Sequence, residues 1–177
     1  MLDALITSKT RVKLLLKFFI NSNASSYLRS LEHEFGESTN AIRLELNRFE
    51  KAGLLSSDTR GNRKYFQANT GHPLFKDIHN LLLKHIGFDQ IIERVISKLG
   101  DVKEVYLVGE FAKGVDSKVI DLIFVGKDID KGYLVRQIER TEDLIKRKIR
   151  YLVFDGGNYT EFLEEFKPGE ILLLWKE

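Results

Sequence analysis

The stretch STNAIRLELNRFEKAGLLSS, residues 38–57, decides the fold of the first half of the chain. Its apolar residues recur at helical spacing before the strand-like Leu54 and Leu55. Ser38 is a residue type that caps helix N-termini, and Gly53 is of the type that ends helices. We therefore predict a helix that follows Ser38 and runs to Ala52.

The two sides of this predicted helix differ in chemistry. On a helical wheel, one side is apolar and should face a core: Ile42, Leu46 and Phe49. The opposite side is polar and basic: Asn40, Arg43, Asn47 and Lys51. In the DNA major groove, Arg pairs with guanine and Asn with adenine through two hydrogen bonds each. We predict that Asn40, Arg43 and Asn47 read bases and that Lys51 contacts phosphate.

The neighbouring segments predict two further helices and a β-hairpin. Residues Ser8–Asn21 have helical spacing, Asn21–Ser26 are a polar turn, and Tyr27–Phe35 form a short second helix. The segment Leu54–Ala68 changes to a strand pattern around the turn Arg60-Gly61-Asn62. The cations at the hairpin tip are predicted to contact the DNA backbone: Arg60, Arg63 and Lys64.

Three helices followed by a basic hairpin is the order of a winged helix. Residues 8–87 resemble an ArsR-type winged helix-turn-helix domain, on the stretch 38–57 and on TRGNRKYFQAN, residues 59–69. The resemblance implies binding of double-stranded DNA as a homodimer, with dimer contacts on the first helix and on Pro73–Ile86. Many such proteins sense metals through Cys and His, but this chain has no cysteine, which excludes a thiolate sensor. Three histidines are spaced by seven and six residues and are predicted to be structural: His72, His79 and His85.

Length and charge indicate two modules. The chain has 177 residues, which fits one large domain or two small ones. The net charge of +2 is unevenly spread: residues 1–87 hold 13 Lys and Arg against 8 Asp and Glu, and residues 88–177 hold 15 against 18. The first module is therefore the candidate for nucleic-acid binding. The apolar run Leu14–Ile20 is interrupted by Lys17 and too short to span a membrane, and no signal-peptide pattern is present, so we expect a cytoplasmic protein.

The second half alternates strands and helices. Strands are expected at Val105–Val108, Val119–Val125, Ile149–Phe154 and Ile171–Trp175, with helices at Gly132–Lys148 and Tyr159–Phe166. The predicted fold class is α+β: a winged helix-turn-helix over residues 1–87, a connecting helix over 88–100, and a small α/β domain over 101–177.

The α/β domain resembles the nucleotidyltransferase fold related to DNA polymerase β. The resemblance lies in VYLVGEFAKGVDSKVIDLIFVG, residues 105–126, in which Gly109 and Gly114 match the two glycines of the family pattern. That pattern is a strand, Gly-Ser, a short helix and a strand with Asp-x-Asp. It implies a triphosphate cradle and, with a third carboxylate from a neighbouring strand, a site for two magnesium ions.

The chain departs from the family pattern at the positions that carry the chemistry. Glu110 stands in place of the Ser, Val119 in place of the first Asp, and Arg150 near the place of the third carboxylate. Only Asp121 remains, so we predict no catalytic residue, no cofactor and no metal. Gly109, Glu110, Gly114 and Asp121 would form a degenerate nucleotide site, although Asp116 together with Glu110 leaves a rearranged site conceivable.

These patterns predict a transcriptional regulator with a DNA-binding winged helix and an inactive nucleotidyltransferase-like domain. That domain would serve ligand binding, contact with a nucleotide or protein partner, or dimerisation. Two alternatives remain open. One is a magnesium-dependent nucleotidyltransferase targeted by the winged helix, and the other is a winged helix that binds protein instead of DNA.

Overall fold

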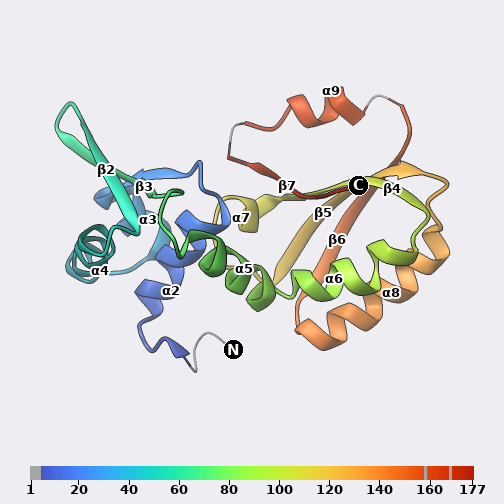
Figure 1. Ribbon diagram of the computed structural model, residues 1–177, viewed down its shortest axis with the longest axis horizontal. Helices are drawn as coiled ribbons and strands as arrows, with labels where there is room; N and C mark the ends of the chain where they lie inside the picture. The colour runs from blue at the N-terminus through green and yellow to red at the C-terminus, as the bar shows by residue number, and fades with distance from the viewer. Residues whose placement is uncertain (1–4, 158, 168) are drawn as a thin grey trace. The chain divides into compact units, whose positions relative to one another are not determined.

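The computed structural model describes residues 5–157, 159–167 and 169–177 (Figure 1). The chain divides into two units, one ending at Leu82 and the other beginning at Leu83. Each unit combines helices with its own β-sheet, which confirms the mixed α and β class expected from the sequence.

The described part of the first unit begins with helical segments and one short strand, followed by a hairpin. Its elements, in chain order, are α2 (Lys9–Leu15), η1 (Leu16–Ile20), β1 (Ser25–Tyr27), α3 (Leu28–Phe35), α4 (Thr39–Lys51), β2 (Leu55–Arg60) and β3 (Arg63–Ala68). Helix α2 continues directly into η1, a π-helical stretch. Ser38 caps α4 by accepting a hydrogen bond from the Ala41 amide, as the sequence predicts.

Strand β1 was not expected from the sequence. The polar composition predicts a turn over Asn21–Ser26 and a helix from Tyr27, but Ser25–Tyr27 pair antiparallel with β3 and α3 begins at Leu28. The three-stranded sheet has the order β1-β3-β2. A three-residue strand is too short to show an alternating pattern, so its partner strand determines it.

The core of the first unit holds α4 in place. Ile42 and Leu46 of α4 are buried, together with Phe18, Phe19 and Leu31 from the two preceding helical segments. The apolar side of α4 that the sequence predicts is therefore its packed side.

Helix α5 (Phe75–Ile86) begins two residues after Pro73, and Gly87, with a φ of 95°, separates it from α6 (Phe88–Arg94). The sequence predicts one helix over Phe88–Leu99, whereas the structure has α6 followed by the short 3-10 helix η2 (Ile96–Lys98). Among the described residues, no helix has both the length and the apolar character needed to cross a membrane.

The second unit is built on a four-stranded sheet. Its strands are β4 (Asp101–Val108), β5 (Val119–Lys127), β6 (Lys148–Asp155) and β7 (Ile171–Lys176), in the order β6-β5-β4-β7. Only β5 and β6 run parallel, and helix α8 (Lys131–Ile145) makes the crossover between them. Helices α6 and α8 cover one face of the sheet, and α9 (Tyr159–Glu164) lies on the other side (Figure 1).

The helix predicted over Gly132–Lys148 ends earlier in the structure. Lys146 has a φ of 57° and closes α8, so Lys148 already belongs to β6. A short helix, α7 (Gly109–Ala112), follows β4 where the sequence predicts the first glycine of the nucleotide pattern.

Candidate nucleic-acid interface and altered carboxylate site

The polar side of α4 is fully available to solvent. Asn40, Arg43, Asn47 and Lys51 are all exposed, on the side opposite the buried Ile42. The Arg43 guanidinium donates a hydrogen bond from Nη1 to Oδ1 of Asn40, 3.3 Å away. The structure therefore places these four predicted residues together on one exposed surface.

A buried carboxylate attaches α4 to the first helix. Glu45 is 5% exposed and accepts hydrogen bonds from Arg11 Nε at 2.9 Å and Nη2 at 3.1 Å. Ser8 Oγ and Arg48 Nη1 donate to the same carboxylate at 3.2 and 3.1 Å. Burial alone would raise the pKa of Glu45, but the hydrogen bonds and charge of Arg11 outweigh it and hold that pKa below its ordinary value.

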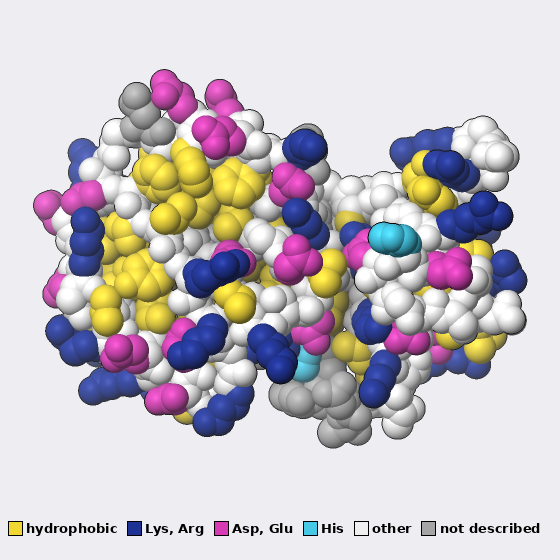
Figure 2. All heavy atoms as spheres, turned by 180° about the vertical axis from the view of Figure 1, so that it is seen from behind, with side chains coloured by type: hydrophobic (Ala, Val, Ile, Leu, Met, Phe, Trp, Pro, Cys, Tyr) yellow, Lys and Arg dark blue, Asp and Glu magenta, His cyan; other side chains and the backbone are white. Residues whose placement is uncertain are grey.

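Two arginines flank the turn of the hairpin. Arg60 and Arg63 are directly opposite each other, and Gly61 between them has a φ of 63°, which glycine adopts without strain. Lys and Arg side chains gather over this hairpin on the face shown in Figure 2, at upper right. The predicted basic hairpin tip is thus exposed.

Tyrosine rings support both arginines. The Arg60 guanidinium lies 5.0 Å from the ring centroid of Tyr65, and the Arg63 guanidinium lies 4.6 Å from that of Tyr27. The two rings contact each other edge to face at 5.3 Å. Cation–π stacking of this kind reduces the conformational freedom of a guanidinium while leaving its donors exposed. Arg60 also pairs with Asp58 at 2.7 Å.

Lys64, like Arg60, already has a carboxylate partner. Its Nζ donates to Oε2 of Glu50 on α4 at 2.8 Å, and the hydroxyl of Ser57 donates to the same carboxylate. These hydrogen bonds lower the pKa of Glu50. The contact connects the C-terminal end of α4 to the hairpin and offsets the charge of Lys64.

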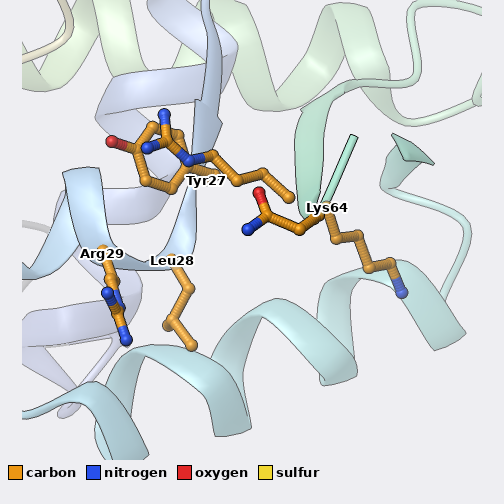
Figure 3. A pocket seen from close by; sticks show the side chains of 6 residues that line it. Tyr27, Leu28, Arg29 and Lys64 are labelled. Carbon is orange, nitrogen blue, oxygen red and sulfur yellow. The ribbon is translucent and has the colours of Figure 1, made fainter. Parts of the chain in front are cut away.

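A concavity of about 410 Å³ lies beside the hairpin (Figure 3). It is lined by Tyr27, Leu28 and Arg29 from the β1–α3 junction and by Asn62, Arg63 and Lys64 from the hairpin. Sequence analysis missed Arg29, which is exposed in the first turn of α3. Its only signal was a positive charge near a helix start, and pairing between β1 and β3 is what brings that charge to the hairpin.

In the second unit, an arginine pairs with Asp121, the carboxylate that the sequence analysis assigns to a degenerate nucleotide site. Asp121 on β5 is paired in register with Arg150 on the parallel strand β6. Arg150 Nε lies 2.6 Å from Oδ1 of Asp121, and Nη2 lies 3.0 Å from Oδ2. This bidentate geometry is the strong form of an arginine–carboxylate pair. Val119 shares a face of the strand with Asp121, because side chains alternate along a strand.

The first residue of α7, directly after β4, lies against Asp121. Gly109 has a φ of 70°, and a Cβ atom added there would be 2.4 Å from Oδ2 of Asp121. Glu110 is exposed on α7, and Gly114 lies in the turn that follows this helix. The structure therefore brings Gly109 and Asp121 together, with Glu110 on the solvent side of α7.

The other acidic candidate is also paired with an arginine. Asp116 receives a hydrogen bond from Arg147 Nη1 at 2.8 Å, and the Arg147 guanidinium stacks 5.0 Å from the ring centroid of Phe111. Within the ranges that the structure describes, no three His, Asp or Glu side chains gather so that they could hold a metal ion.

Two of the spaced histidines contact backbone groups, one far along the chain and one nearby. His79 Nδ1 lies 2.7 Å from the carbonyl oxygen of Phe19, and His72 Nδ1 accepts a hydrogen bond from the Leu74 amide at 3.1 Å. Both contacts fit the structural role predicted from their spacing.

Comparison with known proteins gives one distant similarity. No protein-family model matches the chain, and no curated protein matches it. Among solved structures, the chain is similar to a candidate nucleotidyltransferase from Sulfolobus solfataricus, with 26% identity over 53% of this chain and 82% of that chain, and a TM-score of 0.36.

Proposed function

We propose that the chain is a DNA-binding transcriptional regulator whose first unit is a winged helix-turn-helix. The order helix, strand, helix, helix and hairpin, with the sheet order β1-β3-β2, supports this fold. The observation that carries the function is the exposed Asn and Arg surface of α4 next to a hairpin whose tip carries two stacked arginines.

Helix α4 is the proposed recognition helix. An α-helix fits the major groove of B-DNA, and its exposed Asn40, Arg43 and Asn47 have the donors and acceptors that adenine and guanine edges require. Lys51, at the end of the helix, contacts phosphate. Glu45 fixes the rotation of α4 on the first helix, so these side chains are directed outward before DNA arrives.

The hairpin and α3 add backbone contacts. Arg60 and Arg63 contact phosphates or the minor groove next to the site read by α4. Arg29 contributes a third cation beside the concavity. Lys64 and Arg60 contribute less than Arg63, because Glu50 and Asp58 offset their charges.

The second unit is proposed to be a nucleotidyltransferase-like domain without catalysis. The Arg150 pair supports this view, because the charge that a metal would supply next to Asp121 comes from a guanidinium. Exposed apolar side chains gather over this unit on the face shown in Figure 2. The exposed large apolar residues of the unit include Leu144, Leu152 and Leu173. They support a role in partner contact or in forming a homodimer, rather than in turnover.

Binding to a pool of genomic duplex fragments tests the DNA-binding function. We expect the parent chain to bind with an affinity that falls steeply with salt, and the double variant Arg43→Ala, Arg63→Ala to bind at least tenfold more weakly. The matched control removes two exposed arginines of α8, Arg136→Ala with Arg140→Ala, and should bind as the parent does. Equal affinity of all three proteins contradicts the proposed function.

A further inference from the structure

A single leucine lies within the polar surface of α4. Leu44 is 52% exposed, and it is separated by four residues from Asn40 and by three from Asn47. Residues at these spacings are neighbours on one side of a helix. Leu44 therefore shares the surface proposed to face DNA bases and lies opposite the buried Ile42.

An exposed leucine is common on protein surfaces and usually needs no explanation. The position of Leu44 is what distinguishes it. Asn40 and Asn47, on either side of it, are proposed to reach base edges, so a side chain between them enters the same groove. Its side chain is half-exposed, unlike those of Ile42 and Leu46, so the core does not account for it.

The major groove offers one apolar group on its base edges, the C5 methyl of thymine. The other edges present carbonyl oxygens, ring nitrogens and amino groups, and a leucine that covers one of them leaves that group without a hydrogen-bond partner. Contact with the methyl group removes apolar surface of both partners from water. Leucine in this position thus favours thymine over cytosine, which has hydrogen in place of the C5 methyl and an amino group in place of the C4 carbonyl oxygen.

We propose that Leu44 selects thymine in the DNA site by packing on its C5 methyl group. The inference rests on the proposed DNA-binding function and adds a specificity-determining residue to it. The thymine lies adjacent to a base read by Asn40 or Asn47, because these side chains flank Leu44 on the helix. Burial of one methyl group predicts about a fourfold contribution to affinity.

The test uses a duplex selected from a random pool with the full-length chain. Each thymine of the selected duplex is replaced in turn by deoxyuridine, which pairs identically and lacks only the C5 methyl. At one thymine per half-site, we expect the parent to lose about fourfold in affinity. Leu44→Ala should bind the thymine duplex more weakly than the parent does. Replacing that thymine by deoxyuridine should not weaken the binding of this variant further.

Two more variants complete the design. Leu44→Gln keeps the length of the side chain and removes its apolar character, so it should also lose the response to deoxyuridine. Val135→Ala removes a comparably exposed apolar side chain from α8 and should respond as the parent does. Circular dichroism establishes that each variant is folded at the temperature of the binding assay.

The outcomes distinguish a failure of this inference from a failure of the proposed DNA-binding function. If the parent binds duplex but its response to deoxyuridine is unchanged in both Leu44 variants, or the selected site contains no thymine, the leucine inference is overturned and DNA binding stands. If the parent binds no duplex more tightly than the Arg43→Ala, Arg63→Ala variant does, the proposed function and the inference that rests on it are both wrong.

Discussion

Replacing Glu45 by Gln tests whether the buried carboxylate fixes the recognition helix. Glutamine keeps the volume but removes the charge that receives four hydrogen bonds, two from Arg11 and one each from Ser8 and Arg48. A hydrogen bond to a charged group contributes about 1.5–3 kcal/mol, and breaking a fully buried pair costs about 3–5 kcal/mol.

The exposure of the partners reduces the expected cost. The Arg11 and Arg48 side chains are 35% and 54% exposed, so water replaces part of what they lose. We expect a loss of about 2 kcal/mol in the free energy of unfolding of the first unit. For a unit of this size that loss lowers the melting temperature by roughly 8–16 °C. Urea denaturation followed by circular dichroism measures it, with the exposed Glu139→Gln as the matched control.

The pH dependence gives this prediction a second readout. Because the folded pKa of Glu45 lies below the ordinary value of 4.5, its stabilisation is complete above that pH and is lost as the pH falls through the folded pKa. The difference in stability between parent and Glu45→Gln should therefore be full at pH 7 and shrink progressively below about pH 4.5. A difference under about 0.5 kcal/mol at pH 7, or one that stays constant down to pH 3, refutes the reasoning.

Three further predictions concern the hairpin, the helix and the second unit. Tyr27→Leu removes the ring beneath Arg63, so affinity for duplex DNA should fall about two- to fivefold while the salt dependence, set by the number of cations, stays the same. Lys51→Ala should weaken binding equally across DNA sequences and reduce the slope of log affinity against log salt by about 1; a sequence-dependent effect argues against phosphate contact. Gly109→Ala should destabilise the second unit by about 2–3 kcal/mol in thermal or urea denaturation, from its positive φ and its clash with Asp121. Gly156→Ala, with a similar φ of 73° and open space around it, is the control and should cost only about 1 kcal/mol, so equal losses would contradict the clash.

Local signals in the sequence predict most of the elements of the first unit. Ser38 before α4 and Gly61 in the hairpin turn act through bonds to their own neighbours in the chain, so residue type alone locates them. Strand β1 forms by pairing with β3, which lies about 40 residues further along the chain, and no local sequence pattern predicts such a pairing. The early end of α8 is also not predictable from the sequence, because Lys146 adopts a left-handed conformation that lysine rarely takes.

The candidate site shows the same difference between local and long-range signals in the sequence. Helical spacing alone predicts which side of α4 is exposed, and the structure agrees for Asn40 and Arg43. The carboxylates that attach α4 to the first helix and to the hairpin are not predictable, since Glu45 and Glu50 are ordinary surface residue types in a sequence. Lys64 was predicted as a phosphate contact without its carboxylate partner for this reason. In the second unit, the family resemblance implies that Arg150 stands near the place of a third carboxylate, and the strand register pairs Arg150 directly with Asp121.

The pairing of Asp121 with Arg150 also constrains how this chain could change by mutation. A three-carboxylate site here needs an acidic residue at position 119 and another at position 150. Replacing Arg150 first leaves Asp121, only 17% exposed, without its cation, and replacing Val119 first adds a second negative charge beside a pair that is already neutral. Each of these two substitutions is unfavourable on its own, and only both together would complete a set of three carboxylates. The Asp121–Arg150 pair therefore restrains change at positions 119 and 150, because either substitution alone disturbs a neutral, half-buried ion pair.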